Sequence, residues 1–142
     1  MNQDNRDLLV SALLVGSHPE SRLLLHEVFK KQGWRLYEAS GRRRALECLE
    51  RQPVQVVMAD ADAPGWSWKK VLQDLQQMIN PPQLVVTSRL ADDFLWSEVL
   101  NRGGYDVLPE PFQREEVERV ISSARRHFDG VVNGFRTRAA AS

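Results

Sequence analysis

The carboxylate of Asp60 stands at the end of a short apolar run, within the stretch MADADAPGWSW of residues 58–68. A Pro-Gly pair follows it, and this pair is a strong turn signal. In α/β proteins, chemistry is typically carried out where a buried strand ends and a loop begins. Asp60 is therefore the first candidate for a chemical role. Asp62 and His18 would join it in a metal site, unless they are simply solvated loop residues.

Five short apolar runs have the length of strands, and the segments after them show apolar residues at helical spacing. The predicted strands are residues 8–15, 34–39, 54–59, 83–87 and 105–108, and the last two helices are predicted at 91–101 and 112–128. Strands that alternate with helices predict βαβ units, a parallel sheet and helices on both of its faces. The sequence thus predicts a single three-layer (βα)5 domain of the α/β class, with a doubly wound parallel sheet.

The chain has 142 residues, which suits one domain, and we place that domain at residues 8–129. Residues 1–7 are expected to be an N-terminal extension, and residues 130–142, with a weak apolar pattern, a C-terminal tail or linker. Basic and acidic residues number 19 each, so net charge gives no reason to expect nucleic acid or membrane partners. The single cysteine excludes a disulfide framework and fits the cytoplasm, where we expect the protein.

Four motifs stand at the strand ends in this order: ALLVGSHPESR, VVMADADAPG, VVTSR and GGYDVLPEPF. With them, the chain resembles the receiver (CheY-like) domain of bacterial response regulators over residues 8–128. The resemblance implies a flavodoxin-like sheet with strand order 2-1-3-4-5. It also implies that Asp60 holds the position that accepts a phosphoryl group from a histidine kinase. Thr87 then holds the position of the hydroxyl that binds the phosphoryl oxygens.

Other positions depart from the family pattern. The acidic pair that helps to hold Mg²⁺ is replaced by Gly16 and Ser17, and the lysine that binds phosphoryl oxygens is replaced by Glu110. Mg²⁺ needs several oxygen ligands and gives up its water reluctantly, so we expect Mg²⁺ to bind weakly at best and no cofactor otherwise. The family register also implies a cis peptide bond between Glu110 and Pro111.

Three functions follow from these observations. The leading hypothesis is an atypical receiver that acts as a regulatory protein–protein interaction module without ordinary phosphorylation of Asp60. The alternative is a receiver that a histidine kinase still phosphorylates there. A flavodoxin-like nucleotide or flavin binder is a hypothesis of another class, since GSHPES places two hydroxyls near a helix start. No nucleophile–base pair is visible, so we do not expect an enzyme.

Two further hypotheses concern single side chains. The carboxylates of Asp60 and Glu110 should lie close together, and Arg89 would pair with one or both as a substitute cation. The alternative leaves Arg89 in solvent and turns Glu110 away. Trp96 and Tyr105 are candidate anchors of an interface, because the fourth helix, fifth strand and fifth helix form a face that receivers often use. The expected partners are a sensor kinase, an output protein or domain, or a second copy of the chain.

Overall fold

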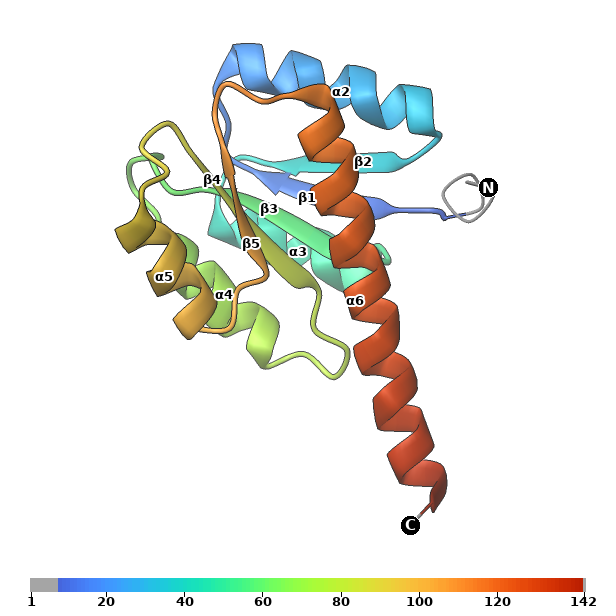
Figure 1. Cartoon of the computed structure of the whole chain (residues 1–142). Helices are drawn as coiled ribbons and strands as arrows, with labels where there is room; N and C mark the ends of the chain where they lie inside the picture. Colours follow the sequence, from blue (N-terminus) through green and yellow to red (C-terminus); the bar gives the residue numbers. More distant parts are fainter. Residues whose placement is uncertain (1–7, 142) are drawn as a thin grey trace.

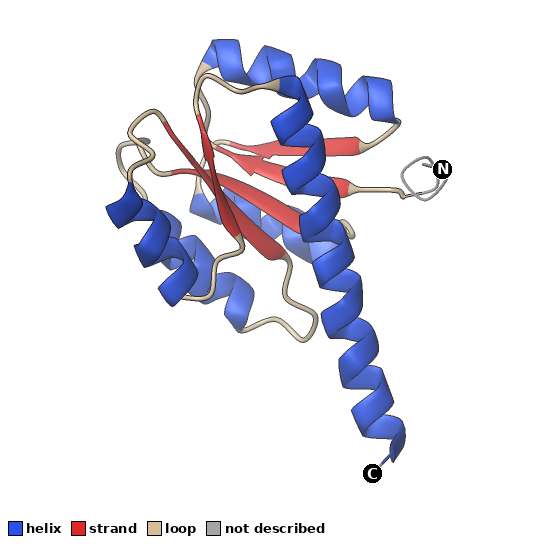
Figure 2. Ribbon diagram, viewed as in Figure 1, coloured by secondary structure: helices blue, strands red, loops and turns tan. Residues whose placement is uncertain are grey.

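The computed structural model describes the backbone of residues 8–141 and the side chains of residues 8–134, so the predicted N-terminal extension lies outside it. Within this range, strands and helices alternate (Figures 1 and 2). The strands are β1 (Ser11–Val15), β2 (Arg35–Ala39), β3 (Val56–Asp60), β4 (Gln83–Ser88) and β5 (Asp106–Pro109). The helices are α2 (Pro19–Gln32), α3 (Arg42–Arg51), α4 (Trp68–Gln76), α5 (Asp93–Asn101) and α6 (Arg114–Ala141).

The strands form one parallel sheet in the order β2-β1-β3-β4-β5, which confirms the predicted fold class and strand order. Figure 2 shows the helices in layers on the two sides of this sheet. Each layer has its own apolar core: α2 and α6 cover one face, and α3, α4 and α5 cover the other. No described helix is long and apolar enough to cross a membrane.

The alternation of side chains along β3 determines where Asp60 points. Val56 and Met58 belong to the core under α2 and α6, whereas Val57 and Ala59 belong to the core on the opposite face. Because successive side chains of a strand point to opposite faces, the pattern assigns Asp60 to the α2 and α6 side. The sheet therefore directs this carboxylate toward the start of α2 and the loop before α6.

The last helix differs from the prediction. It was expected to end at residue 128, but α6 continues to Ala141, so most of the predicted tail or linker is helical. Gly130 and Gly134 are the reason for the error, since each costs about 1 kcal/mol relative to alanine within a helix without forcing the helix to end. A Cβ at either glycine would meet no other atom within 4 Å, so this part of α6 projects beyond the sheet (Figure 1).

Candidate functional site

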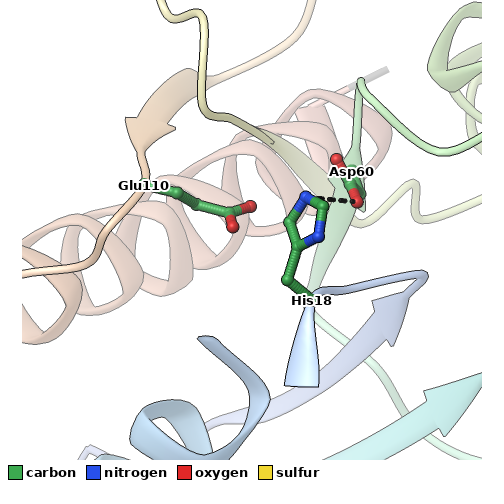
Figure 3. A group of neighbouring side chains, drawn as sticks. All are labelled: His18, Asp60 and Glu110. Carbon is green, nitrogen blue, oxygen red and sulfur yellow. Dashed lines mark ion pairs between the residues drawn. The ribbon is translucent and has the colours of Figure 1, made fainter. Parts of the chain in front are cut away.

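The carboxyl ends of three strands and the loops that follow them bring together His18, Asp60 and Glu110 (Figure 3). His18 lies between β1 and α2, Asp60 is the last residue of β3, and Glu110 follows β5. One donor atom from each residue lies within 4.8 Å of the donor atoms of the other two. The predicted closeness of the Asp60 and Glu110 carboxylates is therefore confirmed, and His18 reaches the same point.

The Asp60 carboxylate is buried, with 3% of the residue exposed. Its Oδ1 accepts a hydrogen bond of 2.8 Å from the backbone N–H of Asp62. Its Oδ2 lies 3.8 Å from Nε2 of His18, which is ion-pair distance but too long for a hydrogen bond. One oxygen thus holds the carboxylate in place, and the other faces His18.

The Glu110 carboxylate is buried too, with 7% of the residue exposed. Its Oε2 accepts a hydrogen bond of 2.7 Å from Oγ of Ser21, in the first turn of α2. Its Oε1 and the Nε2 of His18 are buried without a hydrogen-bond partner in the described structure. An unpaired buried polar group costs about 1–3 kcal/mol, so this arrangement is unfavourable for stability.

Asp62 does not belong to this group, contrary to the metal-site hypothesis. Its Oδ1 accepts a hydrogen bond of 2.9 Å from Oγ of Ser88, and its Oδ2 accepts one of 2.8 Å from the backbone N–H of Arg89. Oγ of Ser88 in turn accepts from the N–H of Leu90 at 3.0 Å. Asp62 therefore joins the loop after β3 to the loop after β4.

Gly16 and Ser17 occupy the loop after β1. Gly16 has a left-handed backbone, with φ of 68°, and Cζ2 of Trp66 lies 2.7 Å from the place where a Cβ would be. The Trp66 ring thus fills the space that a side chain at position 16 would need. Sequence reasoning missed this contact, because the two residues come from different loops and no local pattern links them.

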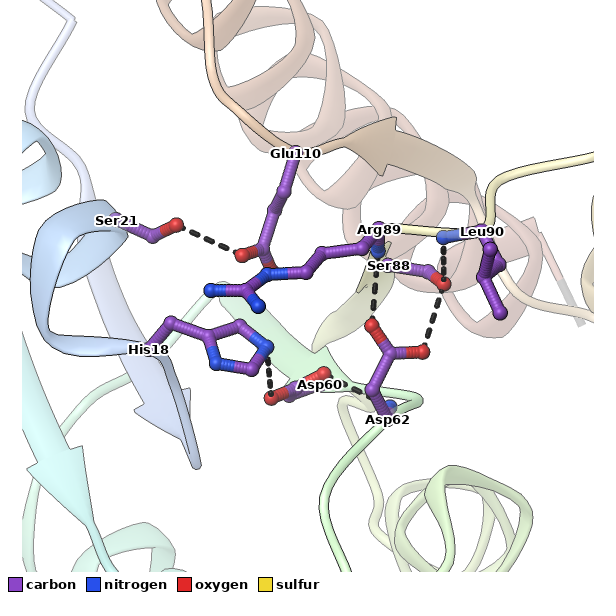
Figure 4. Close-up of polar contacts among 8 residues, drawn as sticks. All are labelled: His18, Ser21, Asp60, Asp62, Ser88, Arg89, Leu90 and Glu110. Atoms are coloured by element: carbon purple, nitrogen blue, oxygen red, sulfur yellow. Dashed lines mark hydrogen bonds and ion pairs between the residues drawn. The ribbon is translucent and has the colours of Figure 1, made fainter.

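Thr87 is buried, with 1% exposed, and is the register partner of Asp60 across β3 and β4. Arg89 follows on the same strand end, and its side chain extends across the site toward Glu110 and His18 (Figure 4). The structure shows no ion pair of Arg89 with Asp60 or Glu110 among the described residues, and Arg89 is exposed, as the alternative hypothesis expects. Glu110 does not turn away, however, because its carboxylate is buried in the site.

The two candidate interface residues differ in exposure. Trp96 on α5 is 48% exposed, and its Nε1 donates a hydrogen bond of 3.1 Å to Oδ1 of Asp106. Tyr105 is partly buried against the core, and its ring lies 5.4 Å from the ring of His127 on α6. Near Trp96, three more apolar side chains are exposed, which sequence reasoning had not selected: Leu90, Phe94 and Leu100.

The expected cis bond between Glu110 and Pro111 is present. This bond precedes α6, on the loop that carries the Glu110 carboxylate into the site.

Comparisons with known proteins identify the family of the chain and agree with its fold. A family model described as "Response regulator receiver domain" matches residues 12–122. The chain is 32% identical over 105 residues to the uncharacterized transcriptional regulatory protein YrkP of Bacillus subtilis, covering 73% of this chain and 45% of that protein. It is 21% identical over 109 residues to sporulation initiation phosphotransferase F of the same organism, covering 77% of this chain and 88% of that protein. The chain thus spans less than half the length of YrkP.

Among solved structures, the fold matches the signal receiver domain of an HD domain-containing protein from Pseudomonas fluorescens Pf-5 with a TM-score of 0.77. The two sequences are 21% identical, and the match covers 87% of this chain and 92% of the other. At this identity the likeness concerns the fold.

Proposed function

The chain belongs to the response regulator receiver domain family of two-component systems, and we propose that it is a receiver whose signalling does not depend on ordinary phosphorylation of Asp60. In this proposal it is a regulatory protein–protein interaction module and not an enzyme, located in the cytoplasm. One observation carries the proposal: a second buried carboxylate, that of Glu110, faces the acceptor position.

The electrostatics of phosphorylation support this proposal. A phosphoryl group adds roughly 1.5 to 2 negative charges at neutral pH. At Asp60 this charge would meet the Glu110 carboxylate, where the family pattern has a lysine. Each charge contact that is lost at a transition state removes about 3–4 kcal/mol of stabilisation. Arg89 reaches across the site (Figure 4), but it makes no ion pair with Asp60 or Glu110 among the described residues.

The residues of the site do not fit Mg²⁺, the ion that the family resemblance implies. A carboxylate at position 16 has no room, because Trp66 fills the space and the backbone is left-handed. Position 17 offers a serine hydroxyl in place of a carboxylate. Mg²⁺ demands octahedral oxygen ligands, whereas the site presents two carboxylates and an imidazole nitrogen. We derive no step of the proposed function through Mg²⁺.

The runner-up function, phosphorylation of Asp60 by a histidine kinase, is favoured by one specific observation. Oδ2 of Asp60 is not fixed by a hydrogen bond and faces His18, whose protonated form would supply a positive charge. No comparable observation favours a nucleotide or flavin binder. The start of α2, where a phosphate would bind, carries Pro19 without a backbone N–H and the acidic Glu20 in its first turn.

The partner surface in this proposal is the face made by α5, β5 and α6, which are the fourth helix, fifth strand and fifth helix of the sequence prediction. Its anchors are Trp96 and the exposed side chain of Leu100, four residues further along α5, with Tyr105 as support beneath. Aromatic residues are enriched at interfaces, and exposed apolar side chains gain from being covered. The partner is a sensor kinase, an output protein or domain, or a second copy of the chain.

The proposal is tested by incubating the purified chain with acetyl phosphate and Mg²⁺ and recording its intact mass. We expect the parent protein to keep its mass, as the Asp60→Asn control does. A gain of one phosphoryl group by the parent that the control lacks would favour the runner-up function instead.

A further inference from the structure

We propose that His18, Asp60 and Glu110 form a binding site for a transition-metal dication of the Zn²⁺ type. The regulatory role of this ion rests on the proposed function, because the ion would occupy the phosphorylation pocket. Binding of the ion is measured independently of that function.

The three side chains present their donor atoms to one point. A ring nitrogen of His18, a carboxylate oxygen of Asp60 and a carboxylate oxygen of Glu110 come from the ends of three different strands or the loops after them and lie within 4.8 Å of one another (Figure 3). In both carboxylates the second oxygen is held by a neighbour: Oδ1 of Asp60 by the N–H of Asp62, and Oε2 of Glu110 by Oγ of Ser21. Such outer contacts orient metal ligands in proteins.

Burial supplies an independent reason to expect a ligand. Glu110 is more than nine-tenths buried, yet its Oε1 has no hydrogen-bond partner in the described structure, and the same holds for Nε2 of His18. Two carboxylates close together in a buried place also repel each other. A dication between the three groups would pair both free atoms and balance both negative charges, whereas Arg89 reaches across the site without forming an ion pair with either carboxylate among the described residues (Figure 4).

The spacing of the donors suits such an ion after a small contraction. Zinc sits about 2.0–2.2 Å from nitrogen and oxygen ligands, so tetrahedral donors are about 3.4 Å apart. Nε2 of His18 and Oδ2 of Asp60 are 3.8 Å apart, close to this value. His18 and Glu110 both lie outside helices and strands, and small rotations of their side chains would close the remaining distance.

The donor set selects the type of ion. An imidazole nitrogen suits Zn²⁺, Cu²⁺, Fe²⁺ and Ni²⁺, whereas Mg²⁺ is bound by oxygen ligands. Bound to Oδ2 of Asp60, the ion would occupy the oxygen that a phosphoryl group needs. The site therefore makes the state of the receiver depend on a transition metal in place of a phosphoryl group.

Isothermal titration of the metal-stripped full chain with Zn²⁺ tests the site. We expect saturable binding of one ion per chain that a large excess of Mg²⁺ does not displace. His18→Gln and Glu110→Gln should each weaken binding by at least about tenfold, as loss of a ligand does. The matched control is His26→Gln, which removes an exposed histidine whose Nε2 also faces a carboxylate, that of Glu38 at 3.0 Å. The control should bind Zn²⁺ like the parent.

Circular dichroism checks that each variant is folded, and a second measurement removes any dependence on the variants. Co²⁺ added to the parent chain should give the intense visible absorption of a tetrahedral site, and Zn²⁺ should abolish it. The proposed site is contradicted if no saturable binding of Zn²⁺ occurs or if His18→Gln binds Zn²⁺ as the parent does. It is also contradicted if His26→Gln weakens binding as much as His18→Gln.

The metal site and the proposed function fail separately. The acetyl phosphate and Mg²⁺ assay, repeated with a chelator that binds Zn²⁺ but leaves Mg²⁺ free, reports on phosphorylation alone. A chain that is phosphorylated there and still binds Zn²⁺ would overturn the proposed function and keep the site. A chain that stays unphosphorylated and binds no Zn²⁺ would overturn the metal site and keep the proposed function.

Discussion

Asp60 ends β3 and Asp62 lies two positions further in the following loop, yet their surroundings are opposite (Figure 4). Asp62 is exposed, and both of its oxygens accept hydrogen bonds from the neighbouring strand end. Asp60 is buried together with Glu110, but Glu110 has a free Oε1 and Asp60 has an Oδ2 whose contact is His18 at 3.8 Å. The carboxylate that water could solvate is fully bonded, and the buried pair is not.

This difference separates a structural aspartate from a functional site. Burying carboxylates without enough partners costs free energy, so stability alone does not explain the pair of Asp60 and Glu110. The hydrogen bonds that Asp62 accepts, in contrast, join the loops after β3 and β4 and stabilise their conformation. Substitutions in the two regions should therefore have opposite effects on stability.

The largest effect is expected where a missing carboxylate is restored. Gly16→Asp should lower the free energy of unfolding by at least about 2 kcal/mol, because a left-handed backbone disfavours a side chain and Trp66 blocks its path. Urea unfolding measures the loss. The matched control is Ser17→Asp at the neighbouring position. Equal stability of parent and Gly16→Asp would show that Trp66 moves aside easily.

Removing the bonded carboxylate should have the next largest effect. Asp62→Ala should lower the free energy of unfolding by about 1.5 kcal/mol, because it leaves Oγ of Ser88 and the N–H of Arg89 without their acceptor. Thermal unfolding measures the loss. The control is Asp93→Ala, which removes an exposed aspartate in the first turn of α5. If both variants have the melting temperature of the parent, the hydrogen bonds of Asp62 do not stabilise the two loops.

The buried pair should respond in the opposite direction. In the metal-free chain, Glu110→Gln should raise the free energy of unfolding by about 1 kcal/mol, because it removes one of two like charges and can keep the bond from Ser21. Glu116→Gln, at a more exposed position of α6, is the control in the same urea series. A clear loss of stability in Glu110→Gln would mean that its charge is already balanced.

The smallest effect concerns an ion pair far from the site. Two hydrogen bonds from Arg42 hold the pKa of the Asp74 carboxyl below its usual value. This pair therefore stabilises the fold above the usual carboxyl pKa, and the contribution is lost as the pH falls through the lowered one. Asp74→Asn should thus narrow the difference between melting temperatures at neutral and acidic pH. An unchanged difference would show that the pair contributes nothing.

The fold followed from the sequence because its signals are local. Strand-sized apolar runs predicted the strands, and apolar residues at helical spacing predicted the helices. The end of α2 at Gly33 was also predicted, and Gly33 has the left-handed φ of 72° that a helix end favours. The end of α6 was predicted too early, because glycine weakens a helix without ending it.

The site was harder to predict, because its decisive contacts are long-range. The resemblance placed Asp60, Thr87 and Glu110 at one edge of the sheet, and the structure agrees. The Trp66 ring over Gly16 and the Oγ of Ser21 on Glu110 depend on loop conformations that no spacing reveals. Arg89 shows the same limit, since the sequence left open whether it pairs with the carboxylates or stays in solvent.

The central claim is that the Glu110 carboxylate stands where the family pattern has a positively charged lysine and so keeps Asp60 from accepting a phosphoryl group. The direct test is the rate at which acetyl phosphate with Mg²⁺ phosphorylates the parent, Glu110→Lys and, as a charge control, Glu20→Lys, followed by intact mass. We predict no phosphorylation of the parent or of Glu20→Lys, and detectable phosphorylation of Glu110→Lys. A parent chain phosphorylated on Asp60 as fast as Glu110→Lys would contradict this account.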